Sequence, residues 1–235
     1  MKKIKYSTFL LTVLITVSSI FNACKKDDNV ASKATFLPNI SIKGDDLIFV
    51  FKGDTYTEPG AEASENGVAI DYTIDGEVDV DNAGAYVLDY LAVNVDGFKA
   101  SDSRTVVVVD TSNGLNSIDI SGNFTRDGQA GSLVTWTKST ELPYTYIANN
   151  PGGVPPSSSA YPDHNAAVYK VFNVAVGVVA VPLQTTETLA PFSCESASGD
   201  PIISFNTDGV SGDVAYVWTV LGANFGTAPR TFRKL

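Results

Sequence analysis

Residues 85–109 read AYVLDYLAVNVDGFKASDSRTVVVV and contain the clearest strand signals of the chain. A run rich in β-branched and aromatic residues stands at each end, and the turn pair Asp96-Gly97 lies between the two runs. A further apolar run, Leu47–Phe51, is bounded by Gly/Asp clusters, and the pattern of an amphipathic helix is missing. The pattern therefore predicts an all-β sandwich over residues 36–110.

A motif in the same region resembles a known domain family. Residues 53–63, GDTYTEPGAEA, are similar to the G-x-x-Y-x-x-P-G-x-x-A signature of bacterial Ig-like domains of the DUF5011 type. Further matches to that family are Gly76-Glu77-Val78-Asp79, the Gly84-x-Tyr86 step and Asn94-x-Asp96-Gly97. The resemblance implies an immunoglobulin-like sandwich that acts as a spacer or presentation module on bacterial surface proteins, and it implies no chemistry.

Residues 117–235 follow a short linker, 111–116, and are also expected to be β-rich. The Val-rich run 168–181 contains Gly177 and is followed by Pro182, which favours two strands that meet near the glycine and end at the proline. The run 213–221 alternates so that Tyr216 and Trp218 share one face, with Trp218 expected in the core.

Terminal strands are expected near residues 120–126 and 230–234, so this half is predicted to be a small β-sandwich or a closed barrel. Its opening, SGNFTR over residues 121–126, resembles the S-G-x-[FY]-x-R start of the C-terminal module in DUF5012-type Bacteroides lipoproteins.

Residues 1–23 have the layout of a signal peptide. A basic start precedes an apolar run over residues 8–21, which is shorter than the ~20 residues that a membrane-spanning helix needs. Ala23 directly before Cys24 resembles the lipobox of bacterial lipoproteins, in which the cysteine becomes the first mature residue and carries the lipid. The alternative is an ordinary secreted protein that is cleaved near Ala23.

Residues 24–35 are polar and are expected to form a tether. Within them, Lys25-Lys26-Asp27-Asp28 resembles the short tag of Bacteroidota lipoproteins that are displayed on the outer face of the outer membrane. The predicted location is therefore the outer membrane, with a lipid anchor on Cys24 and the protein facing the cell exterior.

The charge balance excludes some partners. The whole chain has a net charge of -10, and the part after residue 23 has 13 Lys+Arg against 26 Asp+Glu. Such a chain lacks the basic surface that nucleic acids require, and bulk electrostatics weigh against acidic polysaccharides. With Cys24 lipidated, Cys194 has no partner for a disulfide and is expected in the core.

No catalytic residue, metal site or cofactor is predicted, and the chain is not expected to be an enzyme. The single histidine, His164, lies in a Pro/Ser/Gly-rich loop and is expected to be solvated; no G-x-S-x-G motif occurs. Residues 79–84 begin like a calcium-binding EF-hand loop, but Ala83 and Tyr90 stand at two positions that need oxygen ligands.

A binding site is the more informative hypothesis for the second half. Sugar sites commonly set aromatic faces against pyranose rings, with amide side chains at the hydroxyl groups. The long loop 149–165 and the residues before it carry such side chains, and the candidate ligand-binding residues are Trp136, Tyr144, Tyr146, Asn149, Asn150 and Tyr161. Tyr144 and Tyr146 would share one strand face and could equally belong to the core, and Trp136 is open between the two possibilities.

The leading hypothesis is a lipid-anchored, non-catalytic surface lipoprotein. By family analogy it is an accessory glycan-binding protein of an outer-membrane nutrient-uptake system, with the membrane, a glycan and other uptake proteins as partners. The alternative is a surface scaffold that docks other proteins and has no small ligand. Exposed aromatic residues between 136 and 161 would favour glycan binding, whereas their burial would favour the scaffold.

Overall fold

A computed structural model describes residues 34–158 and 163–235. The predicted signal peptide, Cys24 and most of the predicted tether lie outside these ranges. Residues 37–235 form one compact unit. Within the described ranges, no helix has the length and apolar character that crossing a membrane requires.

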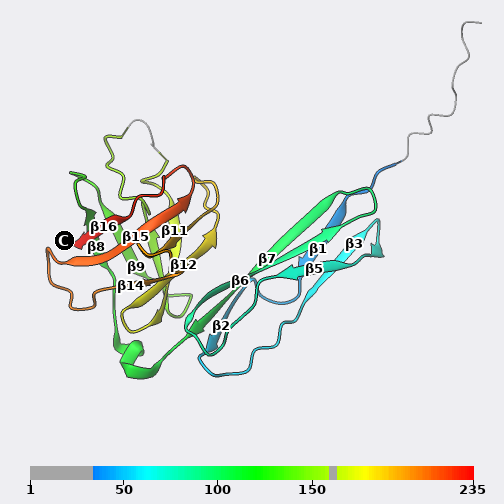
Figure 1. Cartoon of the computed structure of the whole chain (residues 1–235), viewed down its shortest axis with the longest axis horizontal. Helices are drawn as coiled ribbons and strands as arrows, with labels where there is room; N and C mark the ends of the chain where they lie inside the picture. Colours follow the sequence, from blue (N-terminus) through cyan, green and yellow to red (C-terminus); the bar gives the residue numbers. More distant parts are fainter. Residues whose placement is uncertain (1–33, 159–162) are drawn as a thin grey trace, which may run out of the picture. The chain divides into compact units, whose positions relative to one another are not determined.

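The first half of the compact unit is the predicted sandwich, built from two sheets (Figure 1). One sheet has the order β1-β3-β4, with β1 at Pro38–Ile42, β3 at Ala61–Glu65 and β4 at Val68–Ala69. The other has the order β2-β7-β6-β5, with β2 at Leu47–Phe51, β5 at Tyr72–Asp75, β6 at Gly84–Val93 and β7 at Lys99–Val109. The expected Asp96-Gly97 turn joins β6 to β7, and only β2 and β7 pair in parallel.

The Tyr-x-Glu-Pro-Gly part of the expected signature surrounds a buried arginine of β7. Arg104 is 0% exposed; its guanidinium lies 3.4 Å from the Glu58 carboxylate and donates to the Lys43 carbonyl oxygen at 2.6 Å. The Tyr56 hydroxyl and the Gly60 amide both donate to the same carboxylate. The motif therefore has a structural role, because it supplies the counter-charge of a core arginine.

The second half is a closed, up-and-down barrel of eight antiparallel strands, so the structure selects the barrel from the two predicted architectures. The strands follow one another around the barrel in chain order, and the last pairs with the first. They are β8 (Gly122–Arg126), β9 (Val134–Lys138), β10 (Thr145–Asn149), β11 (Val168–Ala175), β12 (Val178–Gln184), β13 (Phe192–Glu195), β15 (Val214–Gly222) and β16 (Arg230–Lys234). A short extra strand, β14 (Ile202–Ser204), pairs with β12 beside β13.

The predicted break near Gly177 is confirmed, since it separates β11 from β12. The prediction that Pro182 ends the strand is wrong, because β12 continues to Gln184 through a register shift between Val181 and Gln184. A proline is tolerated at such an irregularity. There the Gln184 side-chain amide bonds to both the amide and the carbonyl of Lys170, at 2.8 and 3.0 Å, in place of backbone pairing.

The barrel is filled mainly by aromatic side chains. Trp136 packs on the Tyr216 ring at 4.8 Å and on the Phe124 ring at 5.4 Å. As predicted, Trp218 on β15 is in the core at 0% exposed, and Cys194 is a buried free thiol. This interior is a packed core because large rings occupy the centre of a small barrel.

A separate apolar cluster lies where the two halves of the compact unit meet in sequence. The linker residues Ser112–Ser117 form a 3₁₀ turn, and the Leu115 side chain in it is buried. Leu115 packs with apolar residues of β7, β11 and β12, which are Val107, Val109, Phe172, Val174 and Ala180. The linker is therefore an apolar junction, whereas residues 25–35 ahead of the sandwich are polar in sequence.

Candidate functional site

Two of the aromatic residues predicted to bind a ligand lie inside the barrel. Trp136 and Tyr146 are each 1% exposed, and the Tyr146 hydroxyl accepts a hydrogen bond from the Ile120 amide at 3.1 Å. The structure corrects the expectation of an exposed stacking platform here, because β9 and β10 turn these rings toward the barrel core. By the criterion set above, this burial favours the scaffold alternative over glycan stacking on these residues.

Tyr144 and Asn149, which were also predicted to bind a ligand, make contacts within the protein. Tyr144 precedes β10 with a φ of 50°, so it does not share a strand face with Tyr146, and its ring centroid is 6.4 Å from that of Phe49. The Asn149 side chain accepts from the Thr135 amide at 2.7 Å. Tyr161 lies outside the described residues.

The Asn150 side chain organises the turn that follows β10. Its amide donates to the Leu133 and Val154 carbonyl oxygens at 3.0 and 2.9 Å, and its oxygen accepts from the Val154 amide at 2.8 Å. Both of its N–H donors and one lone pair of its oxygen are therefore used inside the protein, and the residue is 1% exposed, which argues against a role in ligand contact.

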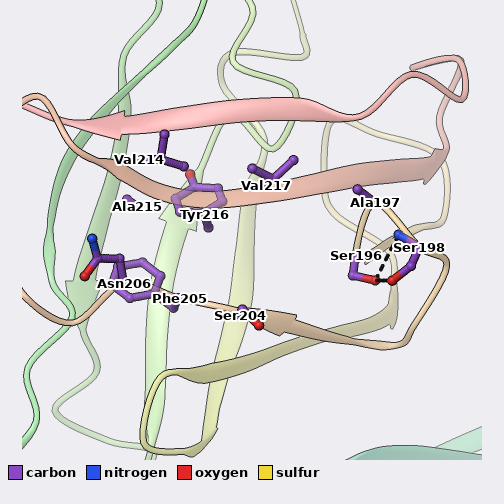
Figure 2. Close-up of a pocket in the computed structure, with 10 residues that line it drawn as sticks. All are labelled: Ser196, Ala197, Ser198, Ser204, Phe205, Asn206, Val214, Ala215, Tyr216 and Val217. Atoms are coloured by element: carbon purple, nitrogen blue, oxygen red, sulfur yellow. Dashed lines mark hydrogen bonds between the residues drawn. The ribbon is translucent and has the colours of Figure 1, made fainter.

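An open hollow of about 700 Å³ lies on the barrel wall, beside β14 and β15 (Figure 2). Phe205 and Tyr216 lie beneath it, with their rings stacked at 5.8 Å and buried in the barrel core. The remaining lining residues are short or half-exposed: Ser196, Ala197, Ser198, Ser204, Asn206, Val214, Ala215 and Val217. The hollow therefore presents small apolar, serine and amide side chains, and none of its ten lining residues is charged.

The hollow exists because two short strands, β13 and β14, together take the place of one full-length barrel strand beside β12. On this side of β15, β13 pairs with Thr219–Gly222, and the next contact is the bridge between Phe205 and Tyr216. The chain between these contacts leaves the wall as a turn, which Ser196 closes by accepting from the Asp200 amide at 3.0 Å. The outward turn leaves the space over Val217 uncovered.

Sequence reasoning did not identify this hollow. Part of its wall comes from a Ser/Gly/Asp turn, whose sequence is typical of any connection between two strands. The shared pairing of β13 and β14 depends on contacts between distant segments, which no local pattern encodes.

Two nucleophile candidates are poorly placed for catalysis. The Cys194 thiol is buried, and its burial raises its pKa, so the reactive thiolate is disfavoured. The expectation that His164 is solvated is wrong: the residue is 9% exposed, and its ring packs at a tilt against that of Phe225, with 4.3 Å between the ring centroids. Burial lowers the pKa of His164, which leaves the ring neutral at neutral pH. In residues 34–158 and 163–235, no three His, Cys, Asp or Glu side chains are grouped so that they could hold a metal ion.

Comparison with known proteins agrees with the fold of the first half. Residues 40–108 match the family described as "Bacterial surface protein, Ig-like domain". A crystal structure of a lipoprotein from Bacteroides thetaiotaomicron is similar at 22% sequence identity, with 85% of this chain and 100% of that chain covered and a TM-score of 0.35. No curated protein matches the chain.

The chain therefore contains an Ig-like domain of the bacterial-surface type, followed by an eight-stranded barrel. The Ig-like domain points to a location at the cell surface.

Proposed function

We propose that this chain is a non-catalytic lipoprotein of the outer membrane that faces the cell exterior. The lipid on Cys24 would anchor it, the Ig-like domain would act as a spacer, and the barrel would bind a glycan for an outer-membrane nutrient-uptake system. The Ig-like family match and the lipobox-like Ala23-Cys24 step support the location. The uncharged hollow beside β14 and β15 supports ligand binding by the barrel.

The hollow suits a neutral sugar better than a charged or wholly apolar ligand. Its volume of about 700 Å³ falls in the range of small-molecule sites. The half-exposed Val214 and Val217 offer apolar contact to a sugar ring. The Ser204 hydroxyl and the Asn206 amide can hydrogen-bond to its hydroxyl groups. The hollow is the observation on which the proposal rests.

A matched pair of variants on a glycan array tests the proposal. Ser204→Trp fills the hollow from an exposed strand position, and Ser103→Trp makes the same substitution at an exposed position of the Ig-like domain. We expect residues 25–235 to bind a neutral glycan that Ser204→Trp loses and Ser103→Trp keeps. Silence of the wild-type protein across the array would contradict the proposal.

A protein-docking scaffold is the second candidate. Burial of Trp136 and Tyr146 favours it, and so do apolar side chains exposed around the turn between β6 and β7, where Val95 is 93% exposed. Substitution of Val95 and Phe98 by Ser in a cross-linking experiment on whole cells would remove the cross-linked partner if this surface docks another protein.

A further inference from the structure

A second pocket, of about 300 Å³, lies at one end of the barrel and contains two arginines. Arg126 ends β8 and Arg230 begins β16, the two strands that close the barrel. Polar side chains of Gln129, Ser158, His164 and Asn224 share the pocket with them, and the Phe225 ring supplies an apolar wall. None of the residues that line this pocket is acidic.

The turn after β10 forms part of the pocket's support. The Gly152 carbonyl oxygen accepts a hydrogen bond from Arg126 at 3.1 Å. A Cβ atom on Gly152 would collide with the Phe225 ring, and one on Gly153 would lie 2.6 Å from the Arg126 Cβ. Because glycine has no Cβ atom, the turn can pack directly against Phe225 and Arg126, which line the pocket.

Arg230 is held rigidly and remains incompletely bonded. The residue is 6% exposed, and its guanidinium donates to the Phe225 and Ala228 carbonyl oxygens. The same group lies 5.5 Å from the centre of the Phe225 ring. Its Nε is buried without a hydrogen-bond partner among the described residues. In the sandwich, Nε and Nη1 of Arg104 also lack a hydrogen bond, but the Glu58 carboxylate lies 3.4 Å from that guanidinium. What distinguishes Arg230 is that no acidic residue lines its pocket.

The two guanidinium charges lack a counter-charge in the described parts of the chain. Arg233, two residues after the pocket arginine of β16, has its Nε 2.7 Å from the Asp127 carboxylate, but no ion pair within 4 Å involves Arg126 or Arg230. Burial lowers the pKa of both pocket arginines, and the charge of Arg126 lowers that of Arg230 further. Arginine nevertheless stays protonated at neutral pH, so the like charges repel each other in a partly desolvated site.

We propose that this pocket binds the oxyanion group of a small ligand, with Arg126 and Arg230 as its charged partners. Planar guanidinium groups fit carboxylates and tetrahedral sulfate or phosphate oxygens, and the amide side chains of Gln129 and Asn224 add neutral donors. The volume fits a single acidic sugar or a group of similar size. This site lies apart from the hollow of Figure 2, since the two share no lining residue, and it does not depend on the glycan proposal.

The net charge of -10 does not oppose such a site. Exposed charges separated by more than the Debye length, ~8 Å at physiological salt, are largely screened, whereas a buried pair acts at close range with little screening. The net negative charge disfavours acidic ligands over the surface as a whole, and the arginine pocket is a local exception.

Isothermal titration calorimetry with matched ligands and matched variants tests the site. Glucuronate and glucose differ in the carboxylate, and sodium sulfate supplies a tetrahedral oxyanion. Arg126→Gln removes a pocket charge, while Arg233→Gln makes the same change in net charge at the exposed arginine paired with Asp127. Ser204→Trp serves as a further control, because it alters the other hollow alone.

We expect glucuronate to bind and glucose not to bind at the same concentration. Arg126→Gln should weaken glucuronate binding by about 10-fold or more, whereas Arg233→Gln and Ser204→Trp should change it by less than about twofold. Competition by sulfate would show that the site accepts oxyanions in general, and binding of sulfate alone would assign it to tetrahedral anions. Failure of both anions to bind, or an equal loss in Arg233→Gln, would overturn the proposal.

Discussion

The two halves of the compact unit differ in whether a buried arginine has a carboxylate beside it. In the Ig-like sandwich, Arg104 is fully buried, and Glu58, itself held by Tyr56 and Gly60, supplies its counter-charge. In the barrel, Arg126 and Arg230 face a pocket without a carboxylate. A charge that is neutralised within the core serves stability, whereas a charge that faces an open pocket without a partner leaves a place for a ligand.

The largest effect is expected from breaking the ion pair of the sandwich. Glu58→Gln leaves Arg104 buried without a counter-charge, so we expect the Ig-like domain to lose about 3–5 kcal/mol in the free energy of unfolding. Hydrogen–deuterium exchange of the β7 amides in increasing urea would measure this loss. Glu62→Gln is the control, since the Glu62–Lys43 pair is exposed and its removal should cost less than about 1 kcal/mol. Equal losses in both variants would contradict this role of Glu58.

A loss of similar size is expected from the barrel core. Trp136→Ala leaves a cavity between Tyr216, Phe124 and Phe205, and we expect the barrel to lose about 3–5 kcal/mol. The remaining Trp218 reports barrel unfolding by fluorescence, because both tryptophans of the chain belong to the barrel. Leu133→Ala, at a side chain 46% exposed, should change stability by less than about 0.5 kcal/mol. A neutral Trp136→Ala variant would mean that this ring is not a core residue.

Acid should weaken the sandwich through Glu58. Burial alone would raise the pKa of this carboxyl, but hydrogen bonds from Tyr56 and Gly60 and the charge of Arg104 outweigh burial and lower it. A folded pKa below the unfolded value of ~4.3 means that the stabilisation is complete above that pH and is lost as pH falls through the lowered folded pKa. Urea unfolding of the sandwich between pH 3 and 6 should show this fall. Glu58→Gln should flatten it, and an unchanged slope would contradict the assignment.

The smallest effect is expected from an arginine of the barrel pocket. Arg126→Gln removes the bond to Gly152 but also relieves repulsion with Arg230, so barrel stability should fall by no more than about 1 kcal/mol. The tryptophan fluorescence midpoint in urea measures it. A loss as large as that of Glu58→Gln would mean that Arg126 is a structural residue like Arg104, and the contrast between the two halves would fail.

The strand pattern could be read from the sequence, but barrel closure could not. Alternation and the Gly177 break located β11, β12 and β15, because these features act within a few residues. Closure depends on β8 pairing with β16 at the other end of the barrel sequence, so a sandwich stayed possible. The register shift at Pro182 could not be predicted for the same reason. It depends on the Gln184 side chain, which bonds to the Lys170 backbone of the neighbouring strand β11 in place of backbone pairing.

The candidate site was harder to predict for the same reason. The sequence around Trp136 does not indicate whether its side chain points into the barrel or outward. The ring is buried because it packs against Tyr216. His164 is buried by Phe225, a contact far along the chain. The prediction that the long loop 149–165 carries a binding site stays a prediction: Val154 and Ser158 line the arginine pocket, whereas Asn149 and Asn150 bond within the protein. The pocket arginines come from the two ends of the barrel sequence and show no common motif.

The most direct test of the contrast is the urea midpoint of barrel fluorescence, measured with increasing glucuronate at constant ionic strength. A ligand that binds only the folded barrel stabilises it by about 2.7 kcal/mol at 100 times its dissociation constant. We predict a midpoint that rises with glucuronate in the wild-type protein, stays constant with glucose and rises clearly less in Arg126→Gln. A wild-type midpoint that stays flat with both glucuronate and sulfate, or an equal rise in Arg126→Gln, would contradict the claim that the barrel arginines bind an anion.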